Sequence, residues 1–131
     1  MEEFVVFNGT VMRGQPAHAN LAGATFLEEV KTAPTYRLYS IGDRYPAMLR
    51  TDSGGSAIAA ELYRVPHQVW PRIRDSEPPG LYRGSLELAD GRVVEGMLGE
   101  ADFVRRHATA EITSYGGWAA YIASRRPPDS R

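Results

Sequence analysis

Phe4-Val5-Val6-Phe7-Asn8-Gly9-Thr10-Val11-Met12 is the stretch of sequence that decides the fold. Its first four residues form a short apolar run of β-branched and aromatic side chains, which is typical of a buried strand. Asn8-Gly9 ends that run, and a second glycine, Gly14, follows before Pro16. Because glycine and asparagine favour turns, we expect a buried first strand that leads directly into a shaped loop.

Short strands and few helices are predicted beyond this stretch. The expected strands cover residues 24–31, 36–41, 47–50, 57–65, 82–88 and 93–98, and the expected helices cover 18–22, 66–74, 101–108 and 118–125. Residues 42–46 and 89–92 are predicted to be turns. This pattern predicts an α+β domain, a small mixed β-barrel with a few short helices. We expect one domain over residues 1–125 and a disordered tail over residues 126–131.

Composition excludes several classes of function. The 131 residues carry a net charge of −1 and contain no cysteine, so disulfides, thiolate nucleophiles and cysteine zinc sites are excluded. His18, His67 and His107 lack the spacing of metal ligands, and we expect neither a metal nor a cofactor. The charge balance predicts no nucleic-acid or membrane partner. Without an apolar run long enough for a signal or a membrane span, the sequence predicts a soluble, cytoplasmic protein.

Three segments, taken in order, resemble the gamma-glutamylcyclotransferase superfamily. Asn8-Gly9-Thr10-Val11 is similar to the family's Tyr-Gly-Ser/Thr-Leu loop, and Tyr39-Ser40-Ile41-Gly42 with Tyr45-Pro46-Ala47 is similar to its middle motif. Ala60-Glu61-Leu62-Tyr63 resembles its Gly-Glu-Val-Tyr strand. The resemblance implies a gamma-glutamylcyclotransferase-like fold and an activity of lyase or transferase type.

Within that superfamily the chain most resembles the C-terminal domain of allophanate hydrolase. The likeness rests on Arg37-Leu38-Tyr39, on residues 86–92 and, most specifically, on Ile112-Thr113-Ser114-Tyr115-Gly116-Gly117-Trp118-Ala119-Ala120-Tyr121. It covers roughly residues 4 to 124. Two departures stand out: Asn8 replaces the loop tyrosine of the cyclotransferases, and no amidase portion is present. We therefore expect a free-standing relative of a domain that is elsewhere fused.

Glu77 is the predicted catalytic residue. It follows Tyr63 by 14 positions, as the resemblance implies for the glutamate that serves as general acid and base. In the cyclotransferase reaction an α-amine loses a proton and the departing amine gains one. A single carboxyl group can do both if burial raises its pKa. The alternative is an ordinary solvated acid beside Pro78-Pro79.

Asn8, Gly9, Thr10, Val11 and Met12 are the predicted substrate-binding loop. Successive backbone N–H groups after a strand can hold an anion, and Gly9 allows a ligand to approach closely. The alternative is a plain turn.

Two further residues, Tyr82 and Glu61, could lie at or near the pocket. Tyr82 is predicted to line the pocket, although a buried structural tyrosine is the alternative. Glu61, within an apolar strand, is predicted to be structural.

The sequence supports three hypotheses about function. The first is a small enzyme that acts on a γ-glutamyl amide or a similar short carboxylated amide, with Glu77 as acid/base. The second comes from the allophanate hydrolase resemblance: action on urea-derived carbamates, where that domain is linked to loss of carbon dioxide from an N-carboxylated carbamate. The third is a non-catalytic domain that binds a small metabolite or docks onto an amidase subunit. The sequence does not identify the substrate or the oligomeric state.

Overall fold

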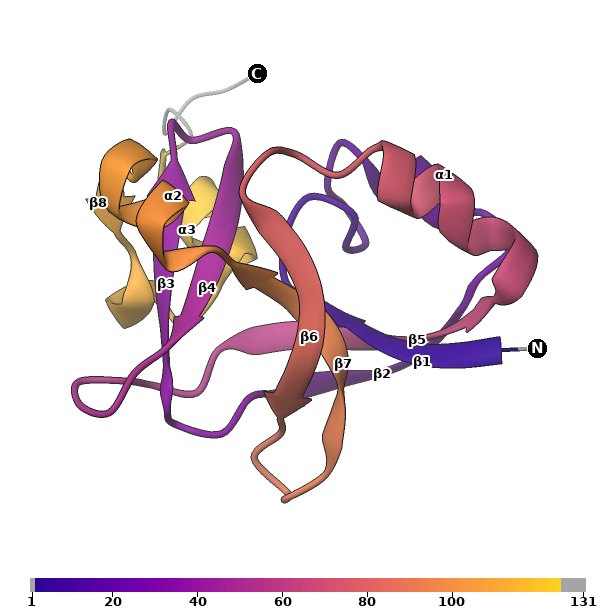
Figure 1. The fold of residues 1–131 in the computed structure, drawn as a ribbon, viewed down its shortest axis with the longest axis horizontal. Coiled ribbons are helices and arrows are strands. Elements are labelled where there is room, and N and C mark those ends of the chain that lie inside the picture. The colour runs from indigo at the N-terminus through magenta and orange to yellow at the C-terminus, as the bar shows by residue number, and fades with distance from the viewer. Residues whose placement is uncertain (1, 126–131) are drawn as a thin grey trace.

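Eight strands in two sheets, with short helices between them, make up the computed structural model, which describes residues 2–125 (Figure 1). The strands are β1 (Glu2–Phe7), β2 (Thr25–Lys31), β3 (Tyr36–Ile41), β4 (Tyr45–Arg50), β5 (Ala59–Pro66), β6 (Leu81–Glu87), β7 (Val93–Gly99) and β8 (Ala110–Glu111). The α-helices are α1 (Trp70–Asp75), α2 (Ala101–His107) and α3 (Trp118–Arg125). Short 3-10 turns are η1 (His18–Leu21), η2 (His67–Val69) and η3 (Thr113–Tyr115).

The larger sheet has the strand order β2-β5-β1-β7-β6, and the smaller one β4-β3-β8. β1 lies at the centre of the larger sheet, antiparallel to β5 and parallel to β7. The two edges of this sheet approach each other beyond β2 and β6, where Ala33 N–H donates to Glu87 O and Ala89 N–H to Lys31 O, both at 2.9 Å. The sheet therefore curves around the core, although it stays open along the rest of its edges.

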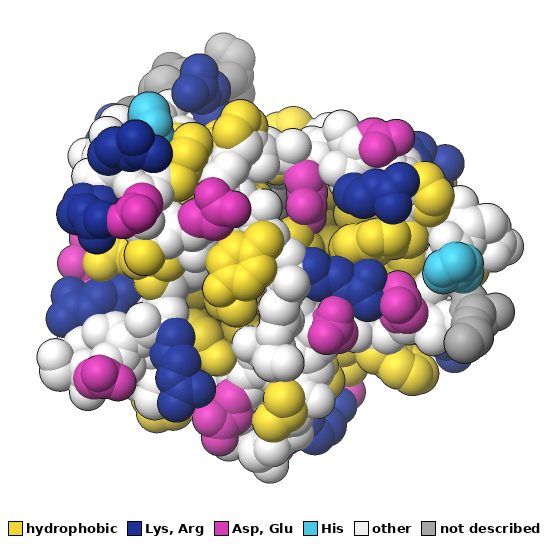
Figure 2. Space-filling model, viewed as in Figure 1, with side chains coloured by type: hydrophobic (Ala, Val, Ile, Leu, Met, Phe, Trp, Pro, Cys, Tyr) yellow, Lys and Arg dark blue, Asp and Glu magenta, His cyan; other side chains and the backbone are white. Residues whose placement is uncertain are grey.

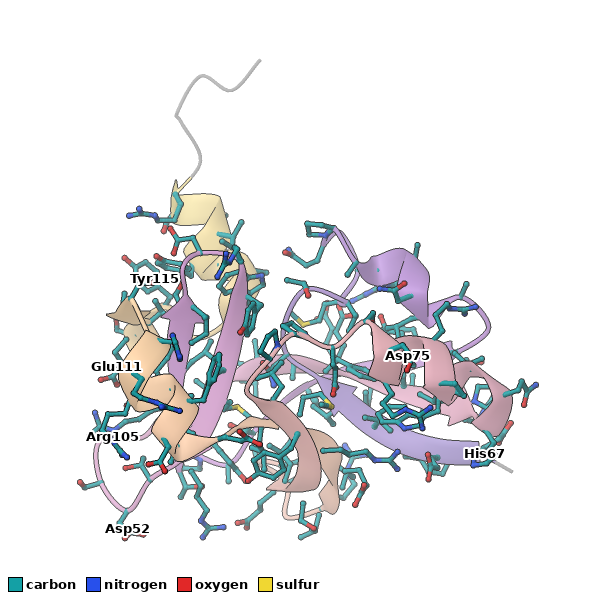
Figure 3. All side chains as sticks on the ribbon, turned by 45° about the horizontal axis from the view of Figure 1, so that its top comes forward. Asp52, His67, Asp75, Arg105, Glu111 and Tyr115 are labelled. Carbon is teal, nitrogen blue, oxygen red and sulfur yellow. The ribbon has the colours of Figure 1, made fainter. Side chains whose placement is uncertain are left out.

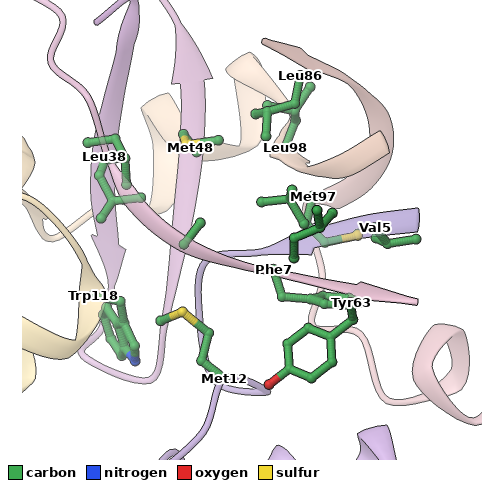
Figure 4. Packing of buried hydrophobic residues seen from close by; sticks show 14 of the residues in the cluster. Val5, Phe7, Met12, Leu38, Met48, Tyr63, Leu86, Met97, Leu98 and Trp118 are labelled. Atoms are coloured by element: carbon green, nitrogen blue, oxygen red, sulfur yellow. The ribbon is translucent and has the colours of Figure 1, made fainter. Parts of the chain in front are cut away.

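The core is centred on β1, as the apolar run at its end predicts. Val5 and Val6 are fully buried and Phe7 is 2% exposed, because β5 and β7 flank this strand on both sides. The ring of Phe7 packs edge-on against Tyr63 of β5, with 5.9 Å between centroids, and Figure 4 shows this pair beside Met12 and Met97. The end of β1 is thus fixed within the core, and so is the start of the loop that follows it.

Each predicted strand and helix has a counterpart in the structure, but the helix expected over 18–22 is the 3-10 turn η1, and neither β8 nor η3 was predicted. Two further predictions need correction. Residues 42–46 are predicted to form a turn, but β4 begins at Tyr45, which pairs with Ile41. Gly42 and Asp43 both have positive φ, 62° and 58°, and the N–H of Arg44 donates to Ile41 O at 3.1 Å, so a tight turn of three residues suffices to reverse the chain. The expected helix over 66–74 is divided into η2 and α1, and Pro66 closes β5 opposite Glu2. The predicted disordered tail lies outside the described residues.

Acidic and basic side chains are interspersed over the surface, as Figure 2 shows for one face. Within residues 2–125 no helix is long and apolar enough to cross a membrane. No group of three metal-ligating side chains gathers in this part of the chain either. His67 lies just before α1, far from Glu111 on the smaller sheet (Figure 3).

Candidate functional site

The loop after β1 is held in one shape by hydrogen bonds at each step. The buried Asn8 side chain donates from Nδ2 to the carbonyl of Met97 on β7 (3.1 Å). Thr10 O accepts the N–H of Ala17 at 2.9 Å. Val11 O lies 2.8 Å from His18 Nδ1, which must be the donor here because a carbonyl only accepts. These contacts order the loop without any ligand.

Three successive N–H groups of this loop, those of Gly9, Thr10 and Val11, have no hydrogen-bond acceptor among the described residues. The next two N–H groups differ, since Met12 donates to Gly9 O at 3.1 Å and Arg13 to Glu61 Oε1 at 3.0 Å. Backbone N–H groups without an acceptor are available to an anion. The candidate anion-binding segment is therefore residues 9–11.

Gly9 is required by the close approach of Pro46 from β4. A Cβ at position 9 would lie 2.8 Å from Pro46 Cδ and 2.9 Å from its Cγ. Both are shorter than side chains tolerate, so the proline ring occupies the space that any other residue would need. This glycine has no positive φ, and packing rather than backbone conformation explains it.

Glu77 lies in the segment that joins α1 to β6, which passes close to the β1 loop at the top of Figure 1. Its N–H donates to Arg74 O at 3.2 Å, which continues the end of α1. Two further bonds fix the residues that follow: the Tyr45 hydroxyl donates to Pro79 O (2.7 Å), and Glu100 N–H donates to Gly80 O (2.8 Å). The rigid Pro78-Pro79 pair is thus anchored to β4 and to the start of α2.

Glu77 and the loop line the same small cavity, with a volume of about 50 Å³. Its polar wall comes from Asn8–Val11 and from Ser76-Glu77. Most of the remaining wall is apolar and consists of Phe7, Ala17, Pro46, Ile73, Pro78, Leu81 and Met97, with Tyr45 beside them. The arrangement brings Glu77 and the residues of the β1 loop together around one largely apolar cavity.

Burial shifts the pKa of the Glu77 carboxyl toward neutrality. It raises the pKa of Glu77 to about 6, against a smaller lowering by the charge of Arg83. Arg83 is itself paired, at 3.0 Å with Glu3 and at 2.6 Å with Glu95. Among the described residues the Glu77 carboxylate has neither a hydrogen bond nor an ion pair. The group can therefore hold or release a proton near neutral pH.

The structure brings most of the predicted site residues together, but not all. Asn8, Gly9, Thr10 and Val11 line the cavity with Glu77. Met12 does not: it is 6% exposed and packs in the core on the other side of the loop. Tyr82 is 45% exposed on β6 and lies outside the cavity, because its neighbour Leu81 supplies the side chain that points inward.

Sequence reasoning missed the contributions of Tyr45 and Pro46. Both belong to the Tyr45-Pro46-Ala47 motif, whose first two residues were expected in a turn. Tyr45 is only 7% exposed, and burial raises the pKa of its hydroxyl, so the group remains a donor to Pro79 O. An aromatic residue followed by proline directly after a Gly-Asp turn was the signal that could have placed them at the start of a strand.

Glu61 has a structural role, because its hydrogen bonds connect the loop after β1 to β5. One carboxylate oxygen accepts from the N–H of Arg13 and from the Tyr63 hydroxyl, at 3.0 and 2.8 Å, and the other accepts from Arg13 Nε at 3.0 Å. Arg13 also pairs with Glu29 at 2.8 Å and lies over the ring of Phe26. Both oxygens of the buried Glu61 are therefore engaged in contacts that hold the loop in place.

Comparison with known families matches residues 3–123 to the allophanate hydrolase C-terminal domain. A curated relative, the urea amidolyase of Saccharomyces cerevisiae, is 32% identical over 130 residues, which are 94% of this chain and 7% of that protein. The chain thus spans only about 7% of the length of the curated relatives it matches.

Three solved structures are similar in fold. A protein specific to uropathogenic E. coli is 36% identical with a TM-score of 0.87, over 96% of this chain and 99% of that one. Allophanate hydrolase from Kluyveromyces lactis is 30% identical with a TM-score of 0.89, over 96% of this chain and 22% of that one. An AIG2-like protein from Mus musculus, 24% identical over 76% of each chain with a TM-score of 0.60, shares the fold alone. The predicted α+β fold of the gamma-glutamylcyclotransferase type is confirmed.

Proposed function

The chain belongs to the allophanate hydrolase C-terminal domain family, and we propose that its cavity binds a short carboxylated amide or carbamate, on which Glu77 acts as acid and base. One observation carries the proposal: Glu77 lines the same cavity as residues 9–11, whose N–H groups have no acceptor among the described residues. The amides suit a carboxylate or carbonyl oxygen of the ligand, and Glu77 suits its nitrogen.

The size of the cavity favours a urea-derived acid. About 50 Å³ is room for roughly three to five water-sized groups, since each needs about 10–15 Å³ of such space. A planar carbamate or carboxylate group is of that size. The apolar wall, with Ile73 and Met97 among its members, removes water from the charged group and favours its conversion to neutral carbon dioxide.

Proton transfer in this reaction assigns a definite role to Glu77. In an N-carboxylated carbamate the bond between nitrogen and the terminal carboxylate carbon breaks. Its electron pair goes to nitrogen, and the carboxylate leaves as carbon dioxide. The protonated Glu77 carboxyl supplies the proton that nitrogen takes up, and its carboxylate is reprotonated from solvent. An anionic ligand in the same cavity would disfavour the ionised form of Glu77, which keeps the acid ready.

A γ-glutamyl amide is the second candidate substrate, and Glu77 itself favours it. The same carboxyl could take a proton from the attacking α-amine and return it to the leaving amine. Such a substrate is larger than the cavity, so its chain would have to extend beyond the mouth. A γ-glutamyl amide would therefore need the mouth of the cavity near Pro78 to be open, whereas a carbamate would fit inside the cavity.

An amidase is the partner that the family suggests. The similar allophanate hydrolase and urea amidolyase chains are far longer than this one. We propose that this chain acts on the product of an allophanate-cleaving amidase, either as a separate subunit or by docking onto that enzyme. The third hypothesis, a binding domain without catalysis, would retain the docking and lose the turnover.

Parallel assays of the purified chain separate these possibilities. The chain is mixed with an allophanate-cleaving amidase, and the release of ammonia and of carbon dioxide is followed. In a second assay γ-glutamyl amides are supplied and the cyclised product is followed by NMR. We expect faster carbon dioxide release in the first assay, lost in Glu77→Gln and retained in Asp75→Asn, whose exposed carboxylate lies outside the cavity.

Two results would overturn the proposal. The first is full activity of Glu77→Gln in whichever assay responds to the wild-type protein. The second is the absence of turnover in both assays, together with no change in the NMR signals of residues 9–11 when the substrates are added.

A further inference from the structure

A second groove lies on the other side of the β1 loop, where α3 begins. Its volume is about 630 Å³, and its walls include Arg13, Lys31, Gly117, Trp118 and Ala120. None of these residues lines the cavity at Glu77. The groove is therefore a separate feature, and a ligand could occupy it whether or not Glu77 is catalytic.

The N-terminus of α3 opens into this groove without a cap. The first helical hydrogen bond runs from Tyr121 N–H to Gly117 O at 3.2 Å, so the N–H groups of Trp118, Ala119 and Ala120 precede the ladder. No side chain in the described part of the chain accepts from them, and no acidic residue stands in the first turn. Gly117 has no side chain that could cap the helix.

The packing of Gly117 places this helix end against β5. A Cβ at Gly117 would lie 3.1 Å from the Cβ of Ala59, and Ala59 N–H donates to Gly116 O at 2.8 Å. The left-handed conformation of Gly116, with φ 81°, turns the chain into α3 at this point. The helix end is thus fixed in position relative to the groove wall.

The indole of Trp118 supplies an independent sign of a ligand. Trp118 is only 2% exposed, and its Nε1 has no hydrogen-bond partner within residues 2–125. Figure 4 shows the edge of the ring that carries Nε1 turned toward Met12, which lines the same groove. A buried N–H without an acceptor costs about 1–3 kcal/mol, and an acceptor at the inner end of the groove would remove that cost.

The charges around the groove favour an anion as that acceptor. Arg13 is neutralised by Glu61 and Glu29, which also line the groove. Lys31, the single lysine of the sequence, has no ion pair among the described residues. The four charged side chains of the groove, Arg13, Lys31, Glu29 and Glu61, sum to zero. The positive end of the α3 dipole, together with a Lys31 ammonium that is not held in an ion pair, is what favours an anion at this point.

We propose that this groove binds a small oxyanion, a carboxylate or a phosphate, at the N-terminus of α3. The N–H groups at the start of the helix and the indole N–H of Trp118 donate to its oxygens, and Lys31 balances its charge. Arg13 belongs both to this groove and to the loop that carries residues 9–11.

The two tryptophans of the chain make the test specific. In ¹⁵N-labelled protein Trp70 and Trp118 each give one indole N–H signal, assigned with Trp70→Phe. Sodium acetate, sodium phosphate and sodium chloride are titrated separately at equal ionic strength. We expect at least one oxyanion to move the Trp118 signal and the amides of Ala119 and Ala120 saturably, while Trp70 stays in place and chloride has no effect.

Exposed positions provide the variants, so none disturbs the core. Lys31→Gln should weaken binding several-fold, and Arg50→Gln, an exposed cation outside the groove, should not. Ala120→Glu puts the chain's own carboxylate at the helix end, and it should abolish binding and raise the melting temperature.

Acetate alone or phosphate alone moving the Trp118 signal would each support the site and identify the oxyanion it prefers. The proposal is overturned if neither moves that signal, if chloride moves it equally, or if affinity is the same in Lys31→Gln and Ala120→Glu as in the wild-type protein.

Discussion

The hydroxyl of Tyr45 donates a hydrogen bond of 2.7 Å to the carbonyl oxygen of Pro79. This bond joins the first residue of β4 to the segment that carries Glu77. Tyr45 and Glu77 line one cavity, and the burial that raises the pKa of Glu77 depends on the segment staying closed against β4. The hydrogen bond therefore supports the position of Glu77 as well as the fold.

Tyr45→Phe should weaken this closure while keeping the ring in place. We expect a loss of about 1 kcal/mol in the free energy of unfolding, because the carbonyl of Pro79 loses its donor. The pKa of Glu77 should move back toward its ordinary value as the segment opens. Chemical denaturation measures the first effect and NMR titration of the Glu77 carboxyl the second. Tyr39→Phe is the control, since the Tyr39 hydroxyl has no hydrogen bond in the described structure; an equal effect there would contradict the prediction.

The stability of the protein should depend on pH through Glu77. Burial raises the pKa of this group from 4.5 to about 6, so the folded chain holds the proton more tightly than the unfolded chain. The stabilisation is complete below about pH 4.5 and is lost as the pH rises through about 6. Relative to Glu77→Gln, the wild-type protein should lose stability across this window and show a constant difference above it. Parallel curves for the two proteins, measured by denaturation at several pH values, would show that Glu77 is not buried in solution.

Gly9→Ala should displace the loop, because the added Cβ would lie 2.8 Å from Pro46 Cδ. We expect a loss of about 1–3 kcal/mol in the free energy of unfolding, the usual range for overpacking. A double-mutant cycle tests the cause. In a Pro46→Ala background the ring is absent, and the same change at Gly9 should cost much less. Additive effects in the cycle would place the strain elsewhere.

Glu61→Gln should destabilise the protein far more than Glu29→Gln. The Glu61 side chain is 10% exposed and accepts from Arg13 and from the Tyr63 hydroxyl, whereas the Glu29 side chain is 78% exposed. We expect about 1–3 kcal/mol for Glu61→Gln, where a charge-assisted network is broken. Glu29→Gln should cost less than about 1 kcal/mol, as exposed ion pairs do. Thermal unfolding of both variants makes the comparison. Similar losses of stability in the two variants would contradict a structural role for Glu61.

The local part of the fold was predictable because its signals are local. The apolar run Phe4–Phe7, the Asp90-Gly91 hairpin and the segment Trp118–Arg125 each gave an element at the predicted place. The start of β4 was not found, since a Gly-Asp pair in left-handed conformation makes a turn shorter than the sequence suggested. The orientation of Met12 was missed for a similar reason. The position of the core, which lies elsewhere in the sequence, decides that Met12 packs inward and away from the cavity.

The sequence by itself determined the order of strands and helices, the family, and the presence of a glutamate 14 positions after Tyr63. Tertiary structure alone decided that this glutamate shares a cavity with residues 9–11, that Tyr45 holds its segment in place, and that Tyr82 faces outward. The alternation of apolar and polar residues, and the residues that favour turns, can be recognised from neighbouring positions in the sequence. Burial of a carboxyl and the freedom of an N–H depend on elements that are distant in sequence and meet only when the sheets pack.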